Sequence, residues 1–348
     1  MGVDVFRFEM AGPGDGRHLR EVLRFIDTTQ AKRIAVVAKT EGTATINDFG
    51  RSLATRAIQD AFAEAGIRTA PNIILSMGSE GIISPGGYLF ADGQSDARAL
   101  EGLAFGLARS QPLTPADMMS ERHIEAARSA TLSAISDAGI RIEDVALVLA
   151  KSPLLTRDKA VHLPAKQKDL ANLSWASRGI AALGIGVALN EIDASLADLD
   201  ALGRRHDLFC RRAMVFSGTE TDRVEIIVLG NKPMVPAAIR CGQIEDIIDI
   251  RGLARVVSDE GSVERALSIS SAGHIVASFL KAGIAPDGTV RGQRTTAFSS
   301  EVDPDKHMRA VGSGVLGALL GDTRFFVSGG AEHQALPGGG LFAVIQKQ

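Results

Sequence analysis

The chain has 348 residues, 45% of them hydrophobic, and its acidic and basic side chains nearly balance at a formal net charge of −3. This length exceeds one ordinary domain, so we expect two or three structural units with ample apolar surface for a core. Mixed charges of both signs argue against a nucleic-acid or anionic-membrane partner, and no apolar run approaches the ~20 residues that span a bilayer. The first residues also lack a signal-peptide pattern, so we expect a cytoplasmic protein.

The first predicted element is a strand that ends in lysine, and it occurs three times. In chain order the runs are RIAVVAK (33–39), DVALVLAK (144–151) and HIVASFLK (274–281), which end at Lys39, Lys151 and Lys281. Short runs rich in β-branched and aliphatic residues are typical of buried strands. A single lysine at a strand end is usually solvated, but three in the same apolar setting indicate side chains that enter one shared cavity.

A helix that carries an arginine follows each lysine. The segments are 46–62, 172–189 and 303–320, and their arginines are Arg51, Arg178 and Arg309. In the first segment apolar residues recur every three or four positions, whereas the second is apolar on nearly all sides and should be buried. In the third, Asp303 is a candidate N-cap with Pro304 at the first helical position.

Each unit then returns to a strand that stops at a serine, followed by glycine and glutamate. The three stretches are IILSMGSEG (73–81), MVFSGTET (214–221) and FFVSGGAEH (325–333), with Ser76, Ser217 and Ser328 at the strand ends. The order strand–Lys, helix–Arg, strand–Ser therefore occurs three times, which predicts three similar α/β modules. We place them at 1–100, 101–240 and 241–348, the second module holding the nucleophile.

These residue types suggest a Ser–Lys dyad. A serine hydroxyl is unreactive at neutral pH without an adjacent base, and lysine is the basic residue present in every copy. Burial and neighbouring cations favour neutral lysine, which is a base. A glycine that follows such a serine lets a backbone N–H approach a substrate oxygen. The residues alone do not decide which of the three pairs reacts.

Other side chains offer weaker signals. The seven histidines form no H-x-H or H-x-x-x-H pair, which argues against a catalytic zinc. Cys210 and Cys241 lie far apart without metal-type spacing, so we expect free thiols.

With these residues in view, the chain resembles the cyanuric acid hydrolase/barbiturase family of ring-opening amidohydrolases. The resemblance extends over almost the whole chain and rests on several blocks in the family's order: FRFEMAGPGD, AKTEGTATINDFGR, AKSPLLT, SRGIAALGIGVALNEI, FSGTETDRVEIIVLGN, APDGTVRGQRTT and FVSGGAEHQALPGGG. It implies three similar domains around a pseudo-threefold axis, with the sheets forming a central β-barrel and the helices outside. The active site would lie on that axis.

The resemblance also implies a role for each repeated residue. Ser217 would be the nucleophile and Lys151 its base. The remaining positions would bind the substrate ring through hydroxyls, backbone N–H groups, guanidinium groups and amines: Lys39, Arg51, Ser76, Met77, Arg178, Gly218, Lys281, Arg309, Ser328 and Gly329. Met77 departs from the family's Ser-Gly-Gly pattern, so its side chain must fit beside the substrate.

A structural Mg or Ca ion is a further implication, since in the family carbonyls of the C-terminal loop help to hold one. The corresponding positions are Ala331, Gln334, Ala335, Leu336 and Gly339. Gly283 stands where a glutamate for the cation is common, and Ala335-Leu336 replaces Gly-Pro, which counts against this ion here. The chemistry itself would require no cofactor.

The expected function is therefore hydrolysis of a cyclic amide C–N bond of cyanuric acid, giving 1-carboxybiuret in s-triazine catabolism. Two alternatives stay open: a barbiturase that opens barbituric acid in pyrimidine catabolism, and a non-catalytic small-molecule binding protein on the same fold. The partner would be a small cyclic imide or ureide, with no nucleic acid or membrane. The resemblance also implies a homo-oligomer, a tetramer.

Overall fold

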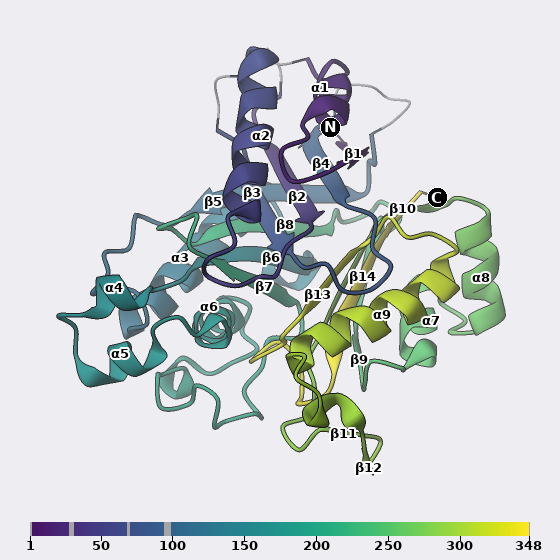
Figure 1. Cartoon of the computed structure of the whole chain (residues 1–348). Coiled ribbons are helices and arrows are strands. Elements are labelled where there is room, and N and C mark those ends of the chain that lie inside the picture. The colour runs from purple at the N-terminus through teal and green to yellow at the C-terminus, as the bar shows by residue number, and fades with distance from the viewer. Residues whose placement is uncertain (1, 28–30, 68–69, 94–98, 348) are drawn as a thin grey trace.

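The computed structural model describes residues 2–27, 31–67, 70–93 and 99–347, and its main strands form three four-stranded sheets built to one plan (Figure 1). The first sheet has the order β1-β4-β2-β3. Its region comprises β1 (Val3–Glu9), α1 (Arg17–Leu23), β2 (Ile34–Thr40), α2 (Gly50–Glu64), β3 (Asn72–Met77) and β4 (Gly86–Asp92).

The second sheet has the order β5-β8-β6-β7. Its region comprises β5 (Leu103–Arg109), α3 (Glu121–Ala138), the 3-10 turn η1 (Ile142–Asp144), β6 (Val145–Pro153), α4 (Arg157–Ala160), α5 (Ala165–Leu170), α6 (Ser174–Ala188), η2 (Ala194–Leu196), β7 (Ala213–Gly218) and β8 (Glu225–Asn231).

The third sheet has the order β13-β10-β14-β9. Its region comprises β9 (Ile239–Ile244), α7 (Ile250–Val257), α8 (Val263–Ser271), β10 (Ile275–Ala282), the small hairpin β11 (Thr289–Val290) and β12 (Gln293–Arg294), η3 (Thr296–Ser299), α9 (Pro304–Leu320), β13 (Phe326–Gly329) and β14 (Gly340–Gln346).

Strand directions repeat in all three sheets. The lysine strands β2, β6 and β10 run parallel to the serine strands β3, β7 and β13, with a helix between each pair. The last strand of each region, β4, β8 or β14, runs antiparallel between the lysine strand and the first strand. The mixed α/β architecture is thus as predicted. Among the described residues no named strand is hydrogen-bonded to a strand of another sheet, so strand pairing does not close the three sheets into one barrel. The central barrel and its threefold axis therefore stay a prediction.

Side chains from the inner faces of all three sheets form a common core. Aromatic pairs join the sheets two by two, with ring centroids 5.9 Å apart for Phe90–Phe105, 5.1 Å for Phe216–Phe326 and 5.2 Å for Tyr88–Phe279. Offset and edge-on aromatic contacts of this kind add to the apolar burial. Among the described residues no named strand of one sheet pairs with a strand of another, so the packing of these side chains joins the sheets.

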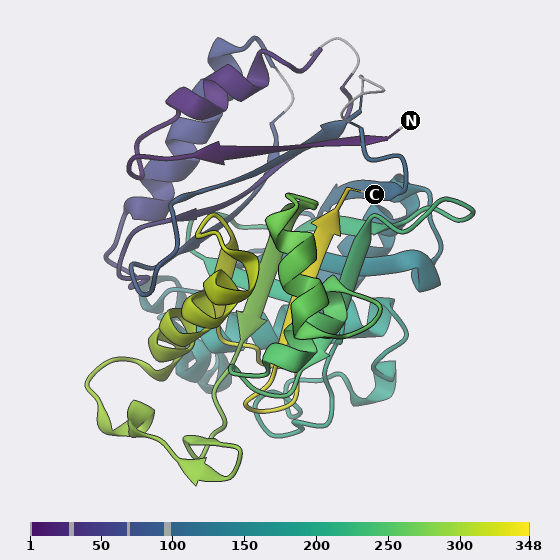
Figure 2. The ribbon, with the colours of Figure 1, turned by 90° about the vertical axis from the view of Figure 1, so that its right-hand side faces the viewer.

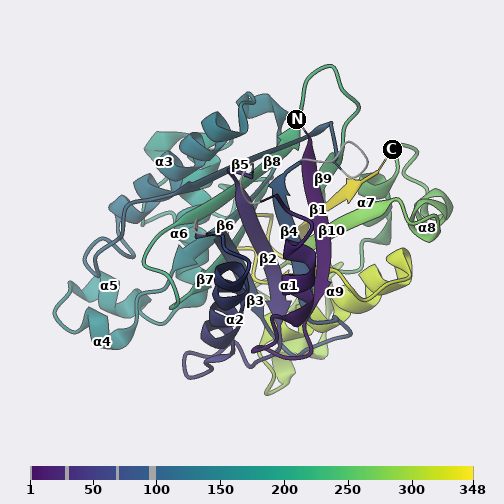
Figure 3. The same cartoon turned by 90° about the horizontal axis from the view of Figure 1, so that it is seen from above.

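Helices cover the outer face of each sheet (Figures 1 to 3). Seen from above in Figure 3, α1 and α2 lie over the first sheet, α3 and α6 flank the second, and α7, α8 and α9 flank the third. A separate apolar cluster fills the space between each sheet and its helices. Because β2, β6 and β10 lie between two such layers, they are apolar along most of their length.

Local sequence fixes the ends of the longer helices. Asp303 accepts the N–H of Asp305 and Pro304 begins α9, as predicted, and Gly321 ends it with φ of 64°. The helix expected over 46–62 begins later, at Gly50, because the Asp48 carboxylate accepts the N–H groups of Gly50 and Thr43 and holds the preceding residues in a loop.

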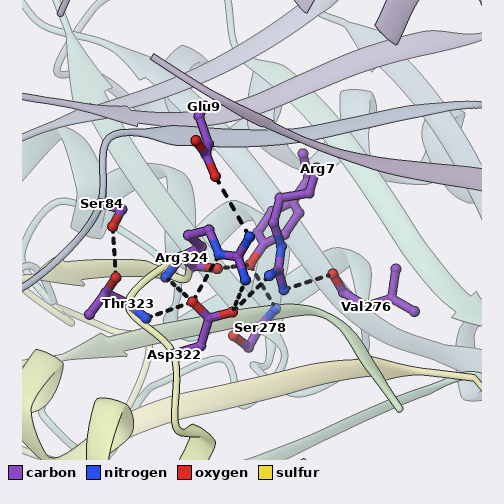
Figure 4. A network of polar contacts seen from close by, with 9 residues as sticks. Arg7, Glu9, Ser84, Val276, Ser278, Asp322, Thr323 and Arg324 are labelled. Atoms are coloured by element: carbon purple, nitrogen blue, oxygen red, sulfur yellow. Dashed lines mark hydrogen bonds and ion pairs between the residues drawn. The ribbon is translucent and has the colours of Figure 1, made fainter. Parts of the chain in front are cut away.

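Polar contacts tie the first region to the third at the edge of the sheets (Figure 4). Arg7 of β1 forms an ion pair with Asp322 at 2.8 Å, and its guanidinium also donates to the carbonyl of Val276. Arg324 contacts Asp322 and Glu9. The Arg7–Asp322 and Glu9–Arg324 contacts join segments more than 300 residues apart, which fixes how the two regions dock. In the described part of the chain, no helix is long and apolar enough to cross a membrane.

Candidate active site

A cavity of about 430 Å³ lies where residues from the three regions meet. Its lining includes most of the predicted site residues: Arg51, Ser76, Met77, Arg178, Ser217, Lys281, Arg309, Ser328 and Gly329. Lys39, Lys151 and Gly218 do not line it. Gly218 directly follows Ser217, and both lysines are at most 2% exposed, each on a strand paired with a serine strand.

Strand pairing brings lysine and serine together. In parallel pairs the carboxyl ends of both strands reach the same edge, so Lys39 lies opposite Ser76 and Lys281 opposite Ser328. In the second sheet the register differs by one residue, since Lys151 lies opposite Phe216 and Ser152 opposite Ser217. All three serines are more than 90% buried.

The lysine amines have different partners. Lys151 Nζ donates to the carbonyl oxygens of Leu75 at 2.9 Å and Ser217 at 3.1 Å. Lys281 Nζ donates to the carbonyl of Gly329 at 2.9 Å and lies 4.7 Å from the Phe216 ring centroid. Lys39 Nζ is buried and has no hydrogen-bond partner among the described residues. Of the three amines, Lys39 is thus the one left without a protein acceptor.

Burial lowers the pKa of all three lysines. It brings the pKa of Lys39 to about 7, with the nearby charge of Arg309 adding to the effect. It brings that of Lys151 to about 8, although the Glu220 carboxylate opposes the shift. For Lys281, burial and the charge of Arg178 lower the pKa well below its usual value. A substantial neutral fraction near neutral pH is what a lysine base requires.

Three glutamates hold the three arginines, and the sequence analysis assigned them no role. Arg51 lies 3.6 Å from Glu220, Arg178 lies 2.7 Å from Glu332, and Arg309 lies 2.8 Å from Glu80. Each arginine thus pairs with the glutamate of the next region in a closed cycle: first to second, second to third, third to first. The signal was present in the sequence, because each glutamate follows the serine by three or four residues.

The arginines also make unequal additional contacts. Arg51 donates to the carbonyl oxygen of Ser217 at 3.0 Å, whereas Arg178 has a second carboxylate partner in Asp305 at 3.2 Å. All three side chains are at most 12% exposed. A guanidinium has several N–H groups, so an arginine that pairs with a carboxylate can still donate hydrogen bonds to further oxygen atoms.

Small residues after the serines are required by close packing. A side chain at Gly218 would meet the Glu220 carboxylate at 2.0 Å, and one at Gly329 would meet the backbone oxygen of Asp305 at 2.5 Å. The larger Met77 is accommodated because its sulfur lies against Gly42 and Gly50, where it would be 2.2 and 3.0 Å from an added Cβ.

Four of the five positions that the resemblance assigns to a cation have oxygens that accept hydrogen bonds within the protein. The carbonyl oxygens of Ala331, Leu336 and Gly339 accept backbone hydrogen bonds, the last from Gly283 at 3.0 Å. Gln334 uses its side-chain oxygen to accept the N–H of Val215. Mg²⁺ and Ca²⁺ prefer six or more oxygen ligands including carboxylates. Among the described residues no group of three or more His, Cys, Asp or Glu side chains gathers that could supply them.

Known proteins share this fold and chain organisation. The family model described as an amidohydrolase ring-opening protein matches residues 4–347. A cyanuric acid amidohydrolase of Ectopseudomonas oleovorans (strain CECT 5344) is 35% identical over 367 residues, covering 99% of both chains. A cyclic amide hydrolase of Azorhizobium caulinodans is 32% identical over 365 residues, again covering 99% of both.

Two solved structures have the same fold over the whole chain. A cyanuric acid hydrolase superposes with a TM-score of 0.87 at 30% identity, and one from A. caulinodans with a TM-score of 0.87 at 28% identity, each covering at least 99% of both chains. The family model and these full-length relatives, which are named amidohydrolases and cyclic amide hydrolases, show that the chain is a hydrolase. More closely, the chain belongs to the ring-opening amidohydrolase family, as the resemblance indicated.

Proposed function

We propose that the protein hydrolyses a C–N bond of cyanuric acid, with Ser217 as nucleophile and Lys151 as its base. The observation that carries the proposal is the convergence of a serine and an arginine from each of the three regions on one cavity of about 430 Å³. Cyanuric acid has three ring carbonyls that alternate with three N–H groups. Three sets of donors around one cavity match such a ring.

The cyclic arrangement of the Arg–Glu pairs favours a pseudo-threefold axis through the cavity. Ser76 and Ser328, with their neighbouring backbone N–H groups, would bind two carbonyls while Ser217 attacks the third. Arg51, Arg178 and Arg309 would donate to the ring oxygens, each charge balanced by its glutamate. On this view the three sheets are three related domains, with boundaries near residues 100 and 240.

The reaction proceeds in two halves. Neutral Lys151 takes the hydroxyl proton of Ser217 while Ser217 Oγ forms a bond to a ring carbonyl carbon. Backbone N–H groups stabilise the resulting oxyanion. The C–N bond breaks and Lys151 returns the proton to the ring nitrogen. Water then adds to the acyl-enzyme and gives a proton to Lys151, the C–Oγ bond breaks, and Oγ recovers the proton. The product is 1-carboxybiuret.

The position of Lys151 supports its role. Its Nζ lies 3.1 Å from the carbonyl oxygen of Ser217, so the amine lies beside the residue whose hydroxyl it would deprotonate. Its pKa of about 8 leaves part of the population neutral at neutral pH, even though its nearest charged neighbour is the Glu220 carboxylate and not a cation as expected.

The deciding experiment compares turnover of cyanuric and barbituric acid by the wild-type chain and by Ser217→Ala, with intact-protein mass spectrometry of the quenched reaction. We expect faster opening of cyanuric acid, a mass increase on the wild type, and neither on Ser217→Ala. Faster opening of barbituric acid would make the protein a barbiturase. Binding without turnover of either compound would leave a small-molecule binding protein.

Assembly and location are separate proposals. Membership of the family supports a homo-tetramer in the cytoplasm, which light scattering of the purified protein and cell fractionation would test.

A further inference from the structure

The turn after the serine is one residue shorter in the second region than in the others. The glutamate follows Ser217 at the third position, whereas Glu80 and Glu332 follow Ser76 and Ser328 at the fourth. The register of the lysine strand against the serine strand is also offset by one residue only in this region. Both differences change where the glutamate lies relative to the lysine.

As a result, Glu220 contacts two cationic side chains at once. Its Oε1 lies 2.6 Å from Lys151 Nζ, and its Oε2 lies 3.6 Å from Arg51 Nε. The carboxylate folds back over Gly218, where an added side chain would collide with it. The Glu220 side chain is 9% exposed, so water screens these charges weakly.

The other two glutamates do not contact their lysines. Glu80 pairs with Arg309 and with Lys306 of α9, while Lys39 Nζ has no hydrogen-bond partner in the described part of the chain. Glu332 pairs with Arg178, and Lys281 Nζ donates instead to the Gly329 carbonyl. An ion pair between this glutamate and the lysine at the strand end thus occurs at one of the three otherwise similar positions.

We propose that Glu220 is the positioning residue that sets the protonation of Lys151, and that its shortened turn makes the second region the reacting one. This inference rests on the proposed function, because it assigns a role to the base of that reaction. During both half-reactions Lys151 becomes an ammonium, and a carboxylate at 2.6 Å stabilises this charged form. Glu220 would thereby also hold the amine in place between proton transfers.

Three charged groups from separate elements face Lys151. Glu220 lies in the turn after β7, Arg51 on α2, and Glu225 at the start of β8. Burial lowers the pKa of Lys151 and Arg51 lowers it further, while both glutamates raise it, Glu220 more than Glu225. Burial raises the pKa of Glu220 itself, but the charges of Lys151 and Arg51 outweigh this and keep it below its ordinary value.

A second cavity borders the Glu220–Lys151 pair. It has a volume of about 670 Å³, and its lining includes Lys151 and Glu220 together with Arg109 and Gln59, but not Ser217. Because Lys151 is 1% exposed, a reagent reaches its amine from this side through local opening of the cavity wall, and the pH dependence of labelling still follows the neutral fraction of the amine. This allows the amine to be titrated directly, without turnover.

The test measures the labelling of Lys151 by acetic anhydride against pH, quantified by peptide mass spectrometry, in the wild type, Glu220→Gln and Glu332→Gln. In Glu220→Gln we expect the midpoint for Lys151 to fall by about one pH unit or more, as loss of a close opposite charge predicts. Glu332→Gln removes the equivalent glutamate of the third region and should leave that midpoint in place. An unchanged midpoint in Glu220→Gln, or an equal change in both variants, would overturn the proposal.

A second variant covers the case in which Glu220→Gln does not fold. Insertion of one glycine between Gly218 and Thr219 lengthens the turn to match the others and keeps the carboxylate. It should move the Lys151 midpoint in the same direction, and an unchanged midpoint would equally count against the role of the turn.

Kinetics separate this inference from the proposed function. The acid limb of kcat/KM for cyanuric acid should move to lower pH in Glu220→Gln, in parallel with the labelling midpoint. If labelling moves but the pH profile does not, Glu220 sets the protonation of Lys151 while Lys151 is not the catalytic base. In that case the assigned mechanism fails and the electrostatic inference stands.

Discussion

The hydroxyl oxygens of Ser76 and Ser328 lie 3.4 Å apart, although 252 positions separate the two residues in sequence. Ser76 is the last residue but one of β3 in the first sheet, and Ser328 is the last but one of β13 in the third. Their proximity means that the edges of two different sheets meet inside the cavity. A planar ligand with several acceptors can therefore contact both at once.

The serines should respond differently to substitution. We expect Ser217→Ala to lower kcat by about 10⁴-fold or more, because removing a nucleophile abolishes the covalent route. Ser76→Ala and Ser328→Ala each remove a hydrogen-bond donor and should cost on the order of 100- to 1,000-fold. Steady-state rates and adduct formation measure both effects. Equal losses for all three variants would contradict a single nucleophile.

Glu332 should matter for substrate binding through Arg178. Glu332→Gln leaves this arginine with Asp305 as its remaining carboxylate partner, so we expect kcat/KM to fall roughly 30-fold, or about 2 kcal/mol for a lost charged hydrogen bond. Asp207→Asn breaks the exposed Arg205–Asp207 pair and is the matched control, with no expected effect. Unchanged kinetics in Glu332→Gln would show that Arg178 does not need its partner.

Lys39 should make the folded state more stable as the pH rises. Its folded pKa of about 7 lies below the unfolded value of 10.5, so the unfolded chain binds more protons between these values. The free energy of unfolding should therefore increase from about pH 7 upward. Below pH 7 the folded state bears the full free-energy cost of burying the charged amine.

The corresponding variant is Lys39→Met. It should raise the free energy of unfolding at pH 6 and flatten its dependence on pH, as measured by urea denaturation at several pH values. The exposed Lys168→Met serves as the control and should change neither. A lower free energy of unfolding for Lys39→Met at pH 6 would contradict this, because it would mean that neighbouring groups stabilise the charged Lys39 amine by more than its burial costs.

Packing between the sheets should dominate stability. Phe279 is fully buried and contacts both Tyr88 and Phe326, so Phe279→Ala should cost about 3–5 kcal/mol. Phe298 is 50% exposed, and Phe298→Ala should change the free energy of unfolding by less than about 0.5 kcal/mol. Similar losses in both variants would mean that the common core does not hold the sheets together.

Local patterns predicted much of the fold. The strand expected at 33–39 corresponds to β2 at Ile34–Thr40, and the helix expected at 172–189 to α6 at Ser174–Ala188. Such segments are recognisable because their apolar residues follow the period of the element. The order of the strands and the antiparallel position of β4, β8 and β14 were not predicted, since pairing depends on contacts between distant segments.

The candidate site was predicted in part. Strand-end lysines and serines could be expected to meet because parallel strands end at one edge, and Lys39 does lie opposite Ser76. A glutamate was visible three or four residues after each of the three serines, yet a charged turn residue is usually solvated. Their partners lie in another region of the chain, so only the folded arrangement shows that Glu80, Glu220 and Glu332 are held by arginines.

The cyclic order of these ion pairs has a consequence for biosynthesis. Arg309 of α9 pairs with Glu80, so the cycle closes only after the last part of the chain has been made and has docked against the first. A nascent or prematurely terminated polypeptide leaves an arginine and a glutamate unmatched and cannot enclose the cavity. The cavity is therefore complete only after the last region of the chain has been made.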